Sequence, residues 1–281
     1  MLAIALALGA ALGWGSSDFL GGLKSRTVPL LQVLLISQVT ALVAVVALVA
    51  FRGAGPPATA ALAPAALAGT SEVIGIAALY RGLAVGTMSI VAPCAATAPV
   101  VPLLAGLVVG EVPGPVQGAG IALAVIGIVV ASFPAAPDGN TPRAAVGPSI
   151  GYGVLAAAGF GAFFSFMDRS GDTSVPWALL GARMTALTLI AVSVAMRRPP
   201  MTPRRANLPV IAGMGFLIVA ADTMYTAAST HGLVGVVAVL GSLHTVVTLA
   251  LARVFLQERL ARPQQAGVLI SLLGVLVIST A

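Results

Sequence analysis

The sequence predicts an all-α membrane protein: a polytopic bundle of ten transmembrane helices built from two inverted five-helix repeats. Three observations predict this architecture. Of 281 residues, 59% are hydrophobic and 8% are charged, whereas about a quarter of the residues in a soluble domain carry charge. Apolar runs of about 20 residues, long enough to cross the hydrocarbon core of a bilayer as helices, recur along the whole chain. Residues of the first half also reappear in order in the second half.

The apolar runs are expected to be helices. Backbone groups that face lipid must be hydrogen-bonded within their own segment, and the period-2 alternation of a membrane barrel is absent. Prolines open several runs, where a missing N–H costs a helix least. The expected spans are Met1 to Gly22, Pro29 to Phe51, Ala58 to Tyr80, Thr87 to Gly110, Pro115 to Phe133, Pro148 to Met167, Pro176 to Met196, Asn207 to Ser229, Leu233 to Leu256 and Pro263 to Ala281.

The two halves of the chain repeat. Five residues recur in the second half, all displaced by 147 positions: Glu111, Gln117, Gly120, Gly127 and Ser132 reappear as Glu258, Gln264, Gly267, Gly274 and Ser279. The longest loop divides the spans five and five. We therefore predict a first repeat over residues 1–134, a linker over 135–147 and a second repeat over 148–281. A unit with five spans ends on the side opposite its start, so its copy enters the membrane inverted, as in many secondary transporters.

Charge and cysteine content exclude several classes of protein. The net charge is +6, but the basic residues lie mainly in short gaps between apolar runs, which is typical of membrane-flanking charge and not of a nucleic-acid interface. Cys94 is the only cysteine, so no disulfide and no cysteine-based metal site can form within the chain. The Gly-x-Gly pairs lack the third glycine and the preceding strand of a dinucleotide fold. We therefore expect no metal and no cofactor.

Charged residues inside the spans are the strongest candidates for a site. Each costs about 2.5–3.5 kcal/mol at a helix centre on insertion scales, so each needs a reason to be there. Glu72 and Asp222 lie near the middles of the third and eighth spans and fall opposite each other when the repeats are aligned at an offset of 150. Arg183, in the seventh span, falls opposite Gln38. The two acids are predicted to bind a proton, a cation or an amine, and Arg183 to pair with them or to hold an anionic group; the alternative is a structural ion pair.

Four further residues are predicted to lie along the substrate or proton pathway. Asp18 is deep in the first span, but a carboxylate that snorkels toward Lys24 is an equal alternative. Trp14, Tyr225 and His244 have aromatic rings with a polar tip, which suit the wall of a cavity. Packing is the alternative for Trp14.

Several segments resemble a known family. The segment Trp14-Gly-Ser-Ser-Asp-Phe-Leu-Gly21 and the twin endings, Leu103 to Glu111 before Gln117 and Leu251 to Glu258 before Gln264, are similar to EamA-type members of the drug/metabolite transporter superfamily. The resemblance implies a ten-helix exporter or importer of metabolites, with a site between the halves. Glu111 and Glu258 are expected to be interfacial carboxylates that end the fourth and ninth helices.

The ninth span departs from the pattern of the family. Members often have proline in both the fourth and the ninth helix. Here Pro99 and Pro102 stand in the fourth, whereas the ninth has Ser242-Leu-His-Thr245 and no proline. A matching break in the ninth helix is therefore not expected.

The predicted function is secondary transport. We expect an exporter or exchanger of a small metabolite such as an amino acid, with alternating access about a midplane cavity and coupling to protons. The partners would be the lipid bilayer of the cell membrane, a small-molecule substrate and protons, and the chain would be a monomer or a homodimer. One alternative is an intramembrane hydrolase, because Gly147-Pro-Ser-Ile-Gly151 matches a nucleophile motif with Ser149; another is a structural or signalling membrane protein.

The orientation of the termini has two conflicting indications. Most basic loop residues follow the odd-numbered spans, and the positive-inside rule then places both termini outside. The family resemblance places both in the cytoplasm.

Overall fold

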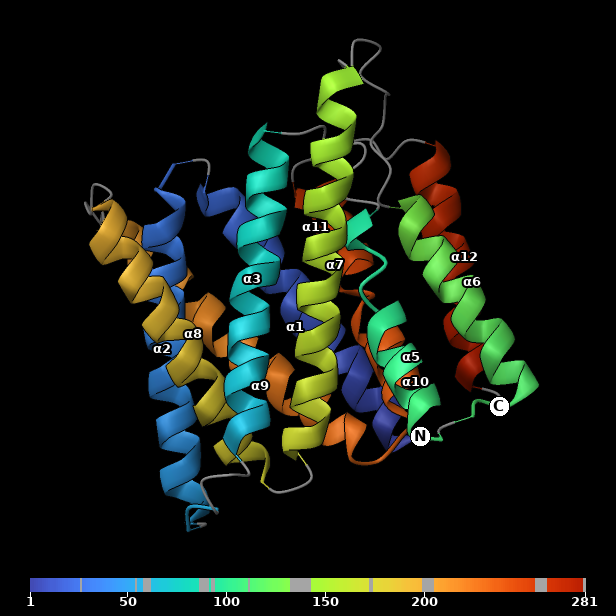
Figure 1. Ribbon diagram of the computed structural model, residues 1–281, viewed down its shortest axis with the longest axis horizontal. Helices are drawn as coiled ribbons and strands as arrows, with labels where there is room; N and C mark the ends of the chain where they lie inside the picture. The colour runs from blue at the N-terminus through green and yellow to red at the C-terminus, as the bar shows by residue number, and fades with distance from the viewer. Residues whose placement is uncertain are drawn as a thin grey trace.

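The computed structural model describes residues 1–25, 27–53, 55–57, 62–85, 91, 94–110, 112–131, 143–171, 174–198, 205–255 and 262–279. All regular structure within these ranges is helical (Figure 1). The elements are α1 (Leu2–Ser25), α2 (Leu30–Arg52), α3 (Ala63–Val85), α5 (Val100–Val108), α6 (Pro115–Ala131), α7 (Arg143–Gly171), α8 (Val175–Arg197), the 3-10 turn η2 (Arg205–Asn207), α9 (Leu208–Ser229), α10 (Val234–Gly241), α11 (His244–Phe255) and α12 (Arg262–Ser279).

The helices have the length and composition of membrane spans. Among the described residues, five stretches are long and apolar enough to cross a bilayer: Leu2–Gly21, Leu31–Arg52, Gly147–Ser170, Val175–Arg197 and Arg205–Ser229. Shorter apolar helices stand at Ala63–Leu79, Pro115–Ala131, Val234–Thr248 and Arg262–Ile278. These positions agree with nine of the segments expected from the sequence. The remaining one is described only in part, because residues 86–90 and 92–93 lie outside the described ranges.

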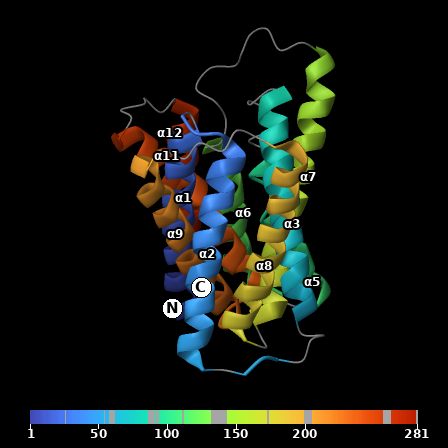
Figure 2. The same ribbon diagram turned by 90° about the vertical axis from the view of Figure 1, so that its left-hand side faces the viewer.

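Most of the helices form two bundles that lie side by side. Bundle A consists of α1, α2, α9, α10 and α11, in which α9 packs against both α1 and α2. Bundle B consists of α3, α5, α7 and α8, in which α3 packs against both α7 and α8. Figure 2 shows α1, α2 and α9 on one side of the molecule and α3, α7 and α8 on the other. The bundles meet where α2 contacts α8 and where α5 contacts α10.

Each bundle takes helices from both halves of the sequence. Bundle A combines α1 and α2 with α9 to α11, and bundle B combines α3 and α5 with α7 and α8. The two bundles are therefore not the two halves of the sequence. The family resemblance implied a site between the sequence halves, whereas the contact surface in the structure lies between the bundles. The remaining pair, α6 and α12, packs together along a line of glycines at one edge of the molecule (Figure 1).

The close contacts of glycines repeat between the two bundles. A Cβ atom added at Gly69 of α3 would meet the carbonyl oxygen of Ala182 on α8. A Cβ atom added at Gly215 of α9 would lie 2.5 Å from the carbonyl oxygen of Ser37 on α2. These two contacts involve corresponding positions of the two repeats, with the order of the halves exchanged. The packing is thus consistent with the two-repeat architecture, because a glycine at the corresponding position of each repeat allows the same pair of helices to pack closely in each bundle.

The ninth apolar segment is interrupted, contrary to the expectation from its sequence. Helix α10 ends at Gly241, and α11 begins at His244. Between them the Leu243 N–H donates to the carbonyl of Leu240 at 3.2 Å, a shorter loop than in an α-helix. The same tight pattern precedes α5, where the Ala98 N–H donates to Ala95. No proline stands at this interruption. The Ser242 hydroxyl donates to the carbonyl of Ala238 at 2.8 Å, a back-bond of the kind that often accompanies a bend in a helix.

Candidate functional site

A buried arginine on α8 contacts polar side chains from both bundles. Arg183 is 1% exposed and donates through both terminal nitrogens to Glu72 of α3, with Nη1–Oε1 at 3.1 Å and Nη2–Oε2 at 2.8 Å. Nη1 also donates to Oε1 of Gln38 on α2 at 3.0 Å. The parallel pair of bonds to Glu72 is the strongest arrangement between a guanidinium and a carboxylate. Glu72 is therefore the principal counter-ion of Arg183, and both belong to bundle B.

The second carboxylate reaches the same arginine from bundle A. Asp222 of α9 is 1% exposed, and its Oδ2 lies 2.9 Å from Nη2 of Arg183. This contact lacks the angle of a hydrogen bond, so Oδ2 has no donor, and the Nε of Arg183 likewise has no acceptor among the described residues. The other oxygen, Oδ1, accepts a hydrogen bond of 2.9 Å from the indole N–H of Trp14 on α1. Asp222 is thus buried with one oxygen incompletely satisfied.

Glu72 and Asp222 do not occupy equivalent positions of the repeat, and the alignment that made them equivalent is wrong. Gly13 of α1 packs on Ala221, and Gly159 of α7, the counterpart of Gly13, packs on Gly75. Ala221 therefore corresponds to Gly75, which places Asp222 about one helical turn beyond the counterpart of Glu72. A shift of one turn keeps a side chain on the same face of its helix. Asp222 on α9 and Glu72 on α3 therefore both face Arg183, although they are not equivalent positions.

An aromatic cluster lies beside Asp222, because Trp14, which donates to this carboxylate, packs against further rings. The ring of Trp14 lies 5.4 Å from that of Tyr225 and 5.7 Å from that of Phe164, centroid to centroid. Phe163 lies 6.3 Å away, in an edge arrangement. The hydroxyl of Tyr225 donates to the carbonyl of Phe164 at 3.3 Å, and its side chain is fully buried. The cluster joins α1, α7 and α9, so aromatic rings from both bundles meet beside the acid.

Asp18 and His244 form a separate polar pair. Asp18 Oδ2 lies 2.8 Å from Nδ1 of His244, and the two side chains are 54% and 32% exposed. The pair links α1 to α11, and the ring of His244 meets that of Trp14 at 6.3 Å. Lys24 instead donates to Oδ1 of Asn207 at 3.1 Å. The alternative in which Asp18 faces Lys24 is therefore wrong.

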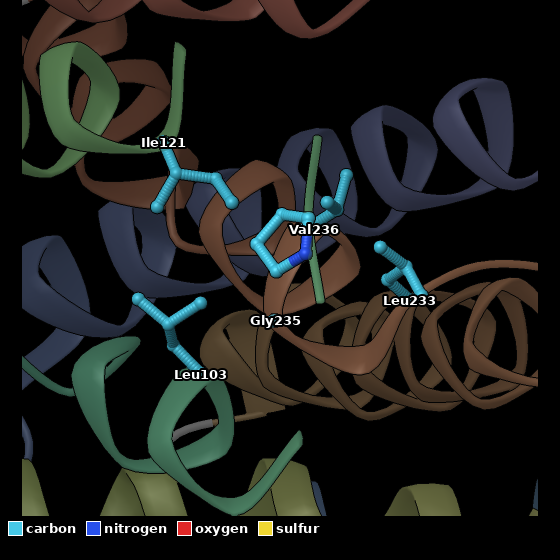
Figure 3. A pocket seen from close by; sticks show the side chains of 6 residues that line it. Leu103, Ile121, Leu233, Gly235 and Val236 are labelled. Carbon is cyan, nitrogen blue, oxygen red and sulfur yellow. The ribbon is translucent and has the colours of Figure 1, made fainter. Parts of the chain in front are cut away.

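Two cavities lie near the contact between α10 and its neighbours. The first has a volume of about 10 Å³, which is about the room that one water molecule needs. Figure 3 shows Leu103, Ile121, Leu233, Gly235 and Val236 around it. The second has a volume of about 160 Å³ and is bounded by α1, α6, α10 and α12, with His231 and Gln117 as polar members of a largely apolar wall. Neither is lined by Arg183, Glu72 or Asp222.

The structure brings most of the predicted residues together. Trp14, Glu72, Arg183, Asp222 and Tyr225 form one connected group, and His244 joins Asp18 to its edge. Glu111 and Glu258 lie outside the described residues. Ser149, proposed as a nucleophile, is fully buried.

Three members of the group were not predicted as site residues: Gln38, Phe163 and Phe164. The position of Gln38 opposite Arg183 in the repeat was the only available signal for it. The two phenylalanines are indistinguishable from other apolar residues of a span.

Comparisons with known proteins agree with the helix arrangement. The model of the EamA-like transporter family matches residues 1–133 and 147–280. A solved crystal structure, described only as that of a protein, is similar with a TM-score of 0.82 and 17% sequence identity, covering 99% of this chain and 96% of the other. At that identity the likeness shows the fold alone. No curated protein matches the sequence.

The apolar helices and their two-repeat packing define a multi-pass membrane protein with a charged centre. The chain belongs to the EamA-like transporter family. It is therefore a membrane transporter of the drug/metabolite transporter superfamily, which acts in a lipid bilayer on a small-molecule substrate, and its family consists of transporters and not of enzymes.

Proposed function

We propose that this protein is a secondary transporter in which bundles A and B rock against each other around the Arg183–Glu72–Asp222 centre. The observation that carries the proposal is the contact between Asp222 and Arg183, because it joins the two bundles at a buried charged point. An ion pair of this kind is expensive to bury and marks a pathway more often than a packing site. Rocking would break this contact while the bonds from Arg183 to Glu72 persist within bundle B.

The proposed architecture is ten transmembrane helices in two inverted five-helix repeats, over residues 1–134 and 148–281. The direction of the helices supports inversion. In Figure 1 α1 begins at the lower edge, beside the N-terminus, and α7 begins at the upper edge. Both chain ends lie on the lower side, as an even number of crossings requires. Inversion gives two nearly equivalent packings, each open to one side of the membrane.

Two approaches lead toward Trp14 and support alternating access. Met1 and Leu240 are among the residues that line the cavity of about 160 Å³. The next residue, Gly241, packs on the Trp14 ring, so that an added Cβ atom would lie 3.2 Å from it. Beyond Trp14 lies the exposed pair of Asp18 and His244. Trp14 would then separate the two sides in this closed conformation, and Asp222 would lie directly behind it.

The proposed substrate is a small metabolite in the size class of an amino acid, moved by export or exchange across the cell membrane. Proton coupling is part of the proposal, because two carboxylates, Glu72 and Asp222, face a single arginine at the centre. The acidic and histidine side chains along the proposed path are Asp18, Glu72, Asp222 and His244, and Tyr225 with Trp14 would form its aromatic wall.

Solute flux into proteoliposomes tests this proposal. A panel of labelled amino acids, sugars and organic cations should include at least one class that enters faster than into empty vesicles, with saturation. Replacing Asp222 by asparagine should reduce that flux at least tenfold, because the contact between the bundles loses its charge. Arg52, exposed at the end of α2, provides the control Arg52→Gln, which should transport normally. Correctly inserted protein that accelerates no solute class would contradict transport.

A further inference from the structure

We propose that the upper face of the molecule in Figure 1 lies against the anionic headgroups of the cytoplasmic leaflet, with Arg197 and Arg198 at the end of α8 as its principal lipid contact. Both chain ends lie on the lower side, so this orientation places them outside the cytoplasm. The inference goes beyond the proposed function and does not depend on it. It begins from the charges of the loops on the two faces.

The loops of the two faces differ strongly in charge. The five loops after the odd-numbered spans contain ten basic residues and two acidic ones. The four loops after the even-numbered spans contain two basic residues and three acidic ones. Basic loops favour the side of a membrane on which the lipid surface is negative, which is the cytoplasmic side.

The structure brings the basic helix ends together on one face. The Nζ atom of Lys24, at the end of α1, donates to Oδ1 of Asn207 at the start of α9, at 3.1 Å. This hydrogen bond places the loop after the first span beside the loop after the seventh. Figure 1 shows that α3 ends on the same upper side, and that α7 and α12 begin there.

The basic side chains of this face lack acidic partners in the part of the chain that the structure describes. Five of them are exposed: Arg81, Arg197, Arg198, Arg205 and Arg262. The ion pairs among the described residues are those of Arg183 at the centre and that of His244 with Asp18. The charge of the upper face is therefore available to anions outside the protein.

The ends of α2 and α8 are equivalent in the repeat but differ in charge. The offset of 145 positions that pairs Gln38 with Arg183 also pairs Gly53 with Arg198. Both caps are left-handed, with φ of 61° and 43°, and each N–H donates to the carbonyl four residues earlier. Glycine adopts this conformation readily, whereas a side chain makes it costly. Arg198 thus occupies a position where backbone geometry favours glycine, which indicates that its charge matters on this face.

Exposed apolar side chains lie next to these arginines on α8. Met196 is 79% exposed, and Val192, about one turn earlier, is 51% exposed. In a membrane such side chains meet acyl chains, and arginines at the end of a span extend toward the headgroups. Guanidinium groups bind phosphate through parallel hydrogen bonds. The end of α8 therefore suits an anionic phospholipid better than a free phosphate, which would contact the arginines alone.

Fluorescence quenching by brominated lipids tests the lipid contact. In a Cys94→Ala background, a bimane label at Met196→Cys lies beside the two arginines, and a label at Phe51→Cys occupies the equivalent position of α2. We expect brominated phosphatidylglycerol to bind about fivefold more tightly than brominated phosphatidylcholine at Met196, and about equally at Phe51. High salt should weaken this preference, whereas inorganic phosphate at constant ionic strength should leave it unchanged.

Variants separate the charge of the helix end from its shape. Arg198→Gly should keep or raise the unfolding midpoint, since glycine suits a left-handed cap, and should lower the preference for phosphatidylglycerol. Combining it with Arg197→Gln should abolish that preference, whereas Arg52→Gln on the opposite face should not affect it. Equal binding of the two lipids at Met196, a preference that survives loss of both arginines, or displacement by inorganic phosphate would overturn the lipid contact.

Cysteine labelling in intact bacterial cells that express the protein tests the orientation. Thr27, in the loop after α1, and Gly55, in the loop after α2, are both exposed and accept single cysteines in the same background. A membrane-impermeant maleimide should label Gly55→Cys in intact cells, and Thr27→Cys only after the membrane is permeabilised. The reverse pattern, or equal labelling of both cysteines in intact cells, would overturn the inference and leave the proposed transport intact.

Discussion

Replacing Arg183 by methionine is expected to destabilise the folded protein by about 3–5 kcal/mol, the usual cost of breaking a buried ion pair by removing one partner. The substitution preserves much of the side-chain volume but leaves Glu72 and Asp222 facing each other without a counter-ion, both largely buried. The unfolding midpoint in detergent, followed by heat or denaturant, measures the loss. We also expect the loss to become smaller at low pH, because protonation of the carboxyl groups removes their repulsion.

Two controls identify the origin of this loss. Arg52→Met changes an arginine that is exposed at the end of α2 and should alter stability little. A triple variant, with Arg183→Met, Glu72→Gln and Asp222→Asn, removes all three charges and should regain a large part of the lost stability, because replacing a whole buried charge network costs far less than breaking it. If Arg183→Met were as stable as Arg52→Met, the centre would not hold the two bundles together.

Replacing Gly215 by alanine is expected to destabilise the protein by about 1–3 kcal/mol, the usual cost of overpacking a tight contact. The new Cβ atom would lie 2.5 Å from both the carbonyl oxygen of Ser37 and Oγ1 of Thr40, so α9 must move away from α2. Because α9 carries Asp222, this movement should also weaken the contact with Arg183. Thermal unfolding and solute flux should therefore decrease together.

The same helix provides a matched control for this change. Gly213 lies two residues earlier on α9, and an added Cβ atom there meets nothing within 4 Å. Gly213→Ala should be neutral or stabilising by up to about 1 kcal/mol, since alanine favours the helix. Gly69→Ala, at the corresponding contact of the other bundle, should repeat the loss seen at Gly215. A loss at only one of the two positions would contradict the repeated packing.

The charged members of the site could be predicted from the sequence because their cost in a membrane is high. Arg183, Glu72 and Asp222 stand in apolar spans where few charged residues occur, and the structure brings all three within hydrogen-bond or ion-pair distance. Their register could not be predicted, because a shift of one turn keeps a side chain on the same face. The contacts of Gly13 and Gly159 reveal the shift.

The packing of the helices into bundles also lay beyond sequence patterns. The repeat can be recognised because identical residues of the two halves are separated by one constant offset. This offset carries no information on which helices pack together. Each bundle combines helices from both halves of the sequence, and contacts such as that of Gly69 on α3 with Ala182 on α8 hold these helices together. The interruption before His244 could not be predicted because this segment lacks proline, the usual sequence signal of a helix break.

The central claim is that bundles A and B move relative to each other about a buried centre. Pulsed electron paramagnetic resonance on reconstituted protein tests it directly, with spin labels in a Cys94→Ala background. One pair of labels, at Leu23 and Arg81, spans the bundles near the ends of α1 and α3; the other, at Phe51 and Arg169, spans them at the opposite ends, on α2 and α7. On adding the transported solute, one distance should lengthen while the other shortens. Two unchanged distances, or two that lengthen together, would contradict alternating access.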